Sequence, residues 1–162
     1  MKTINGQIVP ENLSLSEIKK MMETNDMQTF VIACHALRFS RTHEAYMLLK
    51  KYITTKDKYK LRCILEVIFD YEESVELVSY LVEALQSKER YLITTALAKI
   101  RSGKAVVDDE YIFSCLEKNY KWLDSYDYCI LKAVEKSDIN TERIINLFNK
   151  SDANSVKISE VV

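Results

Sequence analysis

The stretch that decides the fold is Lys56–Ile100, which reads KDKYKLRCILEVIFDYEESVELVSYLVEALQSKERYLITTALAKI. An apolar pattern of helical spacing begins after Asp57, a second apolar run follows it, and the first pattern begins again after Glu89. Apolar residues stand four, seven and eleven positions after each of these two residues. This spacing is typical of an amphipathic helix. The stretch therefore predicts a repeat of helix pairs.

Similar patterns lie on both sides of this stretch. Asp26 opens one before it and Asp124 opens one after it. We call the acidic residues that precede the four patterns the openers; they are Asp26, Asp57, Glu89 and Asp124, and successive openers are separated by 31, 32 and 35 residues. A period of this size with two helices in each unit is typical of a stacked solenoid, in which every unit buries its apolar faces on its neighbours. We expect about four helix pairs, and a second helix over Ser74 to Gln86 in the middle pair.

The flanking segments divide the chain into three parts. Ser14-Leu15-Ser16-Glu17 forms a capping box, which predicts a helix that covers one end of the stack. Residues 1–13 contain a weak hairpin signal at Asn5-Gly6, but a lone hairpin is marginal in water, so we expect an extended arm on the first helix. We predict a single repeat domain over 14–150 and a flexible tail over 151–162, where the sequence is polar and unpatterned.

Composition excludes several classes of protein. Two glycines and one proline in 162 residues favour helices joined by short polar loops. A net charge of −1 disfavours general nucleic-acid binding, which depends on a basic excess. No apolar run is long enough to span a bilayer, and the N-terminal residues lack the apolar core of a signal peptide. We therefore expect a cytoplasmic protein with no membrane partner.

The chain resembles the short form of the HEAT-like repeat family in three features. These are the acidic openers, the short turns, and first helices that end in small or branched apolar residues. Ala33-Ala36-Leu37 and Ala96-Leu97-Ala98-Ile100 carry this resemblance, which covers residues 15–150. It implies an all-α fold, a right-handed α-α solenoid with an N-terminal capping helix. The chain lacks the Val-Arg pair that often follows the opener and the proline of the first helix. The tetratricopeptide and ankyrin patterns match less well.

The sequence offers little for catalysis. Four cysteines lie far apart within apolar patterns, so we interpret them as reduced thiols of the core. His35 and His43 are the only histidines, and we expect both on the surface, because His35 lies opposite the apolar face of its helix. No phosphate loop, catalytic motif or metal-ligand spacing is present. The expectation is therefore a protein without enzymatic activity, cofactor or metal.

The water-facing positions of the second helices are the candidate binding surface. In a HEAT-like solenoid these helices line the concave face, so the middle of that face would be acidic with an aromatic edge. A charged outer face is also what any soluble helix needs. The predicted partner-binding residues are Met47, Glu76, Tyr80, Glu83, Glu110 and Glu117.

Two hypotheses of function follow from this surface. The first is an interaction module that binds a basic protein, either a bacterial immunity protein, since small HEAT-like folds occur among these, or a regulatory adaptor. The second is a HEAT-like DNA-repair enzyme of the alkylpurine glycosylase type. Such enzymes resemble the chain in architecture but are longer and basic, and Trp122 near Asp124 is a weak match to them. A basic surface with clustered arginines would favour the enzyme, and an acidic or apolar groove would favour the interaction protein.

Overall fold

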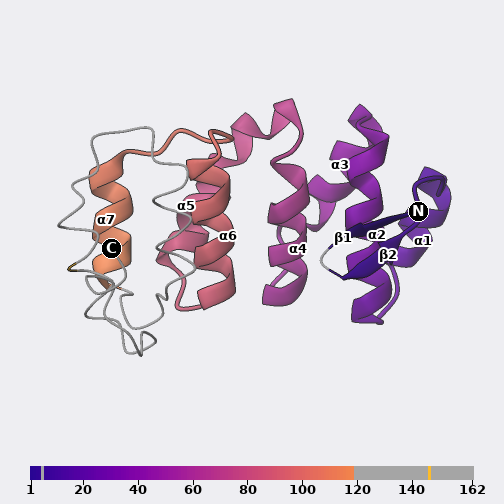
Figure 1. The fold of residues 1–162 in the computed structure, drawn as a ribbon, viewed down its shortest axis with the longest axis horizontal. Coiled ribbons are helices and arrows are strands. Elements are labelled where there is room, and N and C mark those ends of the chain that lie inside the picture. Colours follow the sequence, from indigo (N-terminus) through magenta and orange to yellow (C-terminus); the bar gives the residue numbers. More distant parts are fainter. Residues whose placement is uncertain (5, 119–145, 147–162) are drawn as a thin grey trace. The chain divides into compact units, whose positions relative to one another are not determined.

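A computed structural model describes residues 1–4, 6–118 and 146 of the chain. These residues form an all-α protein with one short β-hairpin (Figure 1). The chain divides into two compact units, Met1–Ser74 and Val75–Val162, and each is described by itself. The single repeat domain and the solenoid stacking stay predictions. The predicted pair after Asp124 and the tail lie outside the described residues.

Unit 1 contains the hairpin and four helices. The strands are β1 (Lys2–Ile4) and β2 (Gln7–Val9), and the helices are α1 (Leu15–Met22), α2 (Met27–Ser40), α3 (His43–Tyr52) and α4 (Lys58–Ile68). A 3-10 helix, η1 (Glu72–Leu77), crosses the boundary into unit 2. In unit 2 the described helices are α5 (Val78–Gln86), α6 (Arg90–Arg101) and α7 (Asp109–Lys118).

The predicted helix starts are confirmed at their caps. Ser14 and Glu17 form the capping box before α1, and the Asp26 carboxylate accepts from the backbone of Thr29 before α2. Asp57 accepts from two backbone N–H groups before α4. Glu89 stands at the cap of α6, although its side chain makes no capping bond. These bonds satisfy backbone donors that a helix start leaves unpaired.

Helix α2 is the centre of unit 1. It packs against α1, α3, α4 and strand β2 (Figure 1). Its predicted apolar residues are all buried, and so are Cys34 and His35 on other sides of the helix. A helix that is buried around most of its circumference carries no clear polar face. The core of the unit is completed by residues of α3 and α4, among them Ala45, Leu49, Ile64, Val67 and Ile68.

The prediction for the first residues was wrong. Lys2–Ile4 and Gln7–Val9 pair as an antiparallel hairpin rather than forming an extended arm. Gly6 has a φ of 78°, which a residue without a side chain adopts easily in a tight turn. The hairpin lies on α2, where Val9 is completely buried. This packing supplies the stability that an isolated hairpin lacks.

In unit 2, α5 packs against both α6 and α7. The predicted core residues of α6 and α7 are buried, and α6 ends before Gly103, whose φ of 79° confirms the predicted end of that helix. The predicted helix over Ser74 to Gln86 begins as the 3-10 helix η1 and becomes α-helical only at Val78. The 3-10 turn changes the side-chain register, so Val75 is 70% exposed instead of joining the apolar stripe.

Leu81 and Val75 together test this register. Leu81 is completely buried, so we expect Leu81→Ala to lower the free energy of unfolding by about 2–5 kcal/mol. Val75→Ala is the matched control, and because Val75 is exposed it should change stability by less than about 0.5 kcal/mol. Urea denaturation of the two variants measures both values. An equal decrease in the free energy of unfolding for Leu81→Ala and Val75→Ala would contradict the register described for η1 and α5.

Candidate functional site

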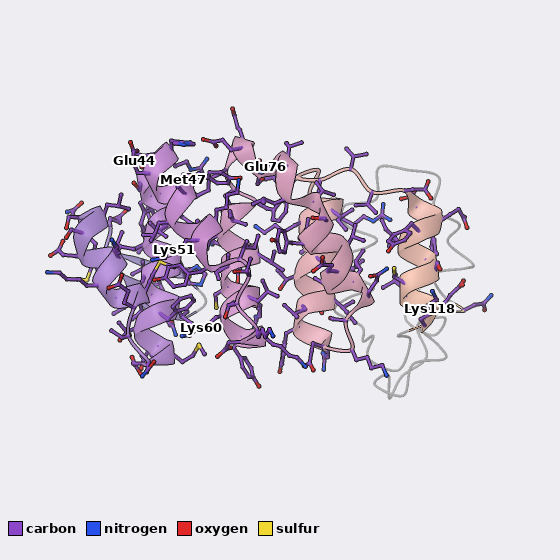
Figure 2. The ribbon with its side chains drawn as sticks, turned by 180° about the vertical axis from the view of Figure 1, so that it is seen from behind. Glu44, Met47, Lys51, Lys60, Glu76 and Lys118 are labelled. Carbon is purple, nitrogen blue, oxygen red and sulfur yellow. The ribbon has the colours of Figure 1, made fainter. Side chains whose placement is uncertain are left out.

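The predicted binding residues are all at least partly accessible. Met47 is 47% exposed on α3, and Glu44 before it and Lys51 after it lie at helical spacing on the same side of that helix (Figure 2). This side of α3 is therefore mixed in charge with an apolar centre. Met47 belongs to unit 1 and the other five predicted residues belong to unit 2. The structure thus places only those five within one unit.

The acidic residues of unit 2 lie on adjoining elements. Glu76 is exposed on η1, Glu83 on α5, and Glu110 and Glu117 on α7, while Tyr80 is half-buried. The Gln86 side chain donates to the Tyr111 hydroxyl, which links α5 directly to α7. Lys118 is the single exposed cation among the parts of η1, α5 and α7 that belong to this unit. We call Glu76, Glu83, Glu110 and Glu117 the acidic surface.

Sequence reasoning helix by helix missed a segregation of charge along the chain. Residues 50–62 hold six cations and one carboxylate, a net charge of +5, whereas residues 70–87 hold five carboxylates and no cation, a net charge of −5. A running count of charge would have found this signal. Lys58 and Lys60 stand in the first turn of α4, where cations oppose the helix dipole. Helix stability therefore does not explain the basic segment.

A second cluster joins α2 to α4 inside unit 1. The Arg38 guanidinium lies 3.2 Å from a Glu66 carboxylate oxygen and 3.3 Å from an Asp70 carboxylate oxygen. It also donates to the backbone carbonyl of Glu66. The Tyr71 hydroxyl donates to the carbonyl of Leu37, next to Arg38 in sequence. These bonds hold the end of α2 against α4, so we assign them a structural role.

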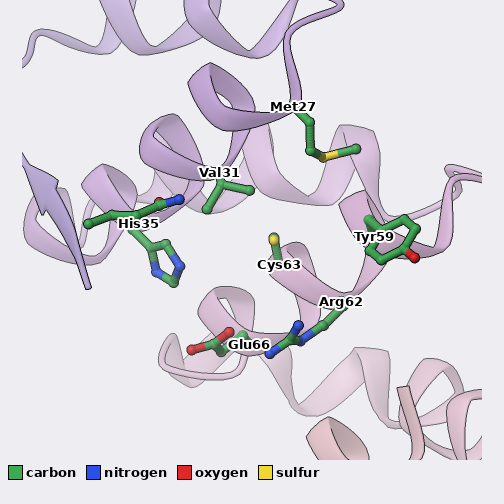
Figure 3. Close-up of a pocket in the computed structure, with 8 residues that line it drawn as sticks. Met27, Val31, His35, Tyr59, Arg62, Cys63 and Glu66 are labelled. Carbon is green, nitrogen blue, oxygen red and sulfur yellow. The ribbon is translucent and has the colours of Figure 1, made fainter. Parts of the chain in front are cut away.

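The prediction that His35 lies on the surface was wrong. Its relative exposure is 2%, because the hairpin covers the side of α2 that was assigned to solvent. His43 is exposed, as predicted, and its Nδ1 atom lies 3.6 Å from a carboxylate oxygen of Glu73. His35 and Gln7 line a cavity of about 310 Å³ between β2, α2 and α4 (Figure 3).

The cysteine thiols in unit 1 are poorly suited to nucleophilic chemistry. Burial raises the pKa of Cys63, which lines the cavity, to about 11, and burial also raises the pKa of Cys34 well above its ordinary range. The thiolate is the reactive form of cysteine, so both side chains are unreactive near neutral pH. Cys115 is buried in unit 2, and Cys129 lies outside the described residues.

Within residues 1–4 and 6–118, no group of three His, Cys, Asp or Glu side chains is arranged to hold a metal ion. No helix in the described part of the chain is both long and apolar enough to cross a membrane. Comparisons of the chain with protein-family models, with curated proteins and with solved structures find no match.

Replacing the arginine that joins α2 to α4 should destabilise unit 1. The Arg38 side chain is only 20% exposed, and Arg38→Met removes its charge-assisted bonds to Glu66 and Asp70. We expect the free energy of unfolding to fall by about 1.5–3 kcal/mol. Chemical denaturation gives the value, with Lys19→Met, at an exposed position of α1, as the control. If Arg38→Met is as stable as that control, the structural role is wrong.

His35 should make stability depend on pH. Burial lowers its pKa from the ordinary value of 6.5, against the smaller opposite effect of Glu66. Between the two pKa values the unfolded chain binds more protons than the folded chain, so stability decreases as the pH falls from about 7.5 to about 5.5. Urea denaturation across this range should show a smaller decrease for His35→Gln.

His43→Gln is the control for this measurement, because His43 is exposed. This variant should retain the pH dependence of the unchanged chain. If the dependence of stability on pH is lost in His43→Gln and kept in His35→Gln, the burial of His35 is contradicted.

Proposed function

We propose that this chain is a non-enzymatic interaction module that binds a basic protein on the acidic surface of unit 2. The observation that supports the proposal is the gathering of Glu76, Glu83, Glu110 and Glu117 on elements that adjoin one another, where the exposed cations near them in the described part of unit 2 include Lys88 and Lys118. Charge complementarity of this kind orients a partner and raises the rate of association. The raised pKa values of Cys34 and Cys63 also favour a binding role over catalysis by thiols.

The chemistry of the partner follows from the surface. The half-buried Tyr80 on α5 and Tyr111 beside Glu110 offer aromatic area next to the carboxylates. Tyrosine is enriched among residues that dominate binding energy at interfaces. A segment that presents Lys or Arg together with an apolar side chain fits this combination. A basic toxin held by an immunity protein and a basic client held by an adaptor both have this chemistry.

Charge reversal tests the proposal. The partner is captured from native cells and purified, and its affinity is measured for a variant with Glu76→Lys, Glu83→Lys and Glu117→Lys. We expect affinity at least about tenfold lower than that of the unchanged chain, and weaker binding in about 300 mM salt than in about 50 mM salt. Isothermal titration calorimetry measures both effects.

The matched control reverses three exposed carboxylates of unit 1, Glu11, Glu23 and Glu44, which changes the net charge by the same amount. This variant should bind the partner as the unchanged chain does. Equal affinity of the two triple variants, or affinity that does not depend on salt, would show that the acidic surface is not where the partner binds.

A further inference from the structure

The cavity in unit 1 has the form of a small-molecule site. It lies between strand β2 and helices α2 and α4 and has a volume of about 310 Å³ (Figure 3). This is at the lower end of the range for ligand pockets in proteins. All of its lining residues belong to unit 1. It is separate from the acidic surface, so its role does not depend on the proposed function.

Two polar atoms at this cavity are buried and have no hydrogen-bond partner. One is the Gln7 side-chain oxygen Oε1 and the other is Nδ1 of His35, a residue with a relative exposure of 2%. Buried polar groups are nearly always paired in native proteins, because leaving them unpaired costs free energy. Both residues line the same cavity, so a rotation of each side chain toward the cavity would allow a single molecule within it to pair both atoms.

The remaining walls limit the chemistry of that molecule. Met27 and Val31 supply apolar surface, and Tyr59, which is 64% exposed, supplies an aromatic ring. Arg62 and Glu66 contribute one positive and one negative charge, so the lining has no net charge when His35 is neutral. In Figure 3 the Arg62 guanidinium and the Glu66 carboxylate lie on the same side of the site, below the Cys63 thiol. A neutral, flat ligand fits these walls better than an ion does.

We propose that this cavity binds a small neutral nitrogen heterocycle that carries an exocyclic amino or amide NH₂ donor beside a ring-nitrogen or carbonyl acceptor. The donor pairs with Oε1 of Gln7. The Nδ1 atom of His35 pairs with the neighbouring group of the ligand, in the tautomer that this group requires. The ring lies against Met27 and Val31, with Tyr59 at its edge or face. The interaction is non-covalent.

Adenine and nicotinamide are the probes, and each has a matched control that lacks the amino or amide group, purine for adenine and pyridine for nicotinamide. The readout is the ¹⁵N chemical shift of the imidazole nitrogens in the full chain. Only two histidines are present, and the exposed His43 serves as an internal reference. We expect one of the two probes to shift His35 Nδ1 with a Kd on the order of 1 mM, and its control to bind about tenfold more weakly.

Gln7→Leu removes the acceptor and should weaken binding of that probe about tenfold, while Gln28→Leu, at an exposed position of α2, should leave it unchanged. Tyr59→Ala removes an aromatic ring that lines the cavity. Because this ring is exposed, the variant tests its contribution to binding without removing a buried side chain. The proposal is overturned if neither probe shifts His35, if purine and pyridine bind as tightly as their partners, or if Gln7→Leu binds like Gln28→Leu. In those cases the cavity holds water only.

Discussion

The enclosure of α2 is the constraint on which unit 1 depends. Three helices and a strand pack around it, and polar bonds add to the apolar contacts of its last turn, where Leu37 is completely buried. Arg38 reaches two carboxylates, and the Leu37 carbonyl accepts from Tyr71. Because almost every side of α2 is covered, polar atoms that the sequence places there become buried. The cavity beside His35 is one result of this enclosure.

Local signals in the sequence were sufficient for much of the fold. The caps at Ser14, Asp26 and Asp57 and the apolar offsets after them depend on residues within a few turns, and the structure confirms them. The hairpin and the burial of His35 were missed for one shared reason. Both depend on contact between β2 and α2, which are separate elements of the chain. A helical-wheel projection of α2 alone does not include contacts with another element. Val75 was misplaced because a 3-10 turn replaced the expected α-helical register.

The candidate sites were predictable to different degrees. Exposure of Glu83, Glu110 and Glu117 follows from α-helical periodicity, and the structure agrees with it, whereas Glu76 is exposed in the 3-10 helix η1, where that periodicity does not hold. Their gathering on adjoining elements needed the packing of α5 on α7. The cavity was not predictable, because Gln7 and His35 come together only through the hairpin. The acidic surface was therefore reached from the HEAT-like resemblance, whereas the cavity in unit 1 became visible only from the tertiary packing.

The pKa of His35 tests the central claim, that the hairpin encloses α2, most directly. It is measured by ¹⁵N NMR titration in the unchanged chain and in Val9→Asp, which places a charge at a completely buried position of β2 and should detach the hairpin. We predict a pKa below 6.5 in the unchanged chain and a rise toward 6.5 in the variant. A His35 that titrates normally in the unchanged chain, or identically in a folded Val9→Asp chain, would contradict the account.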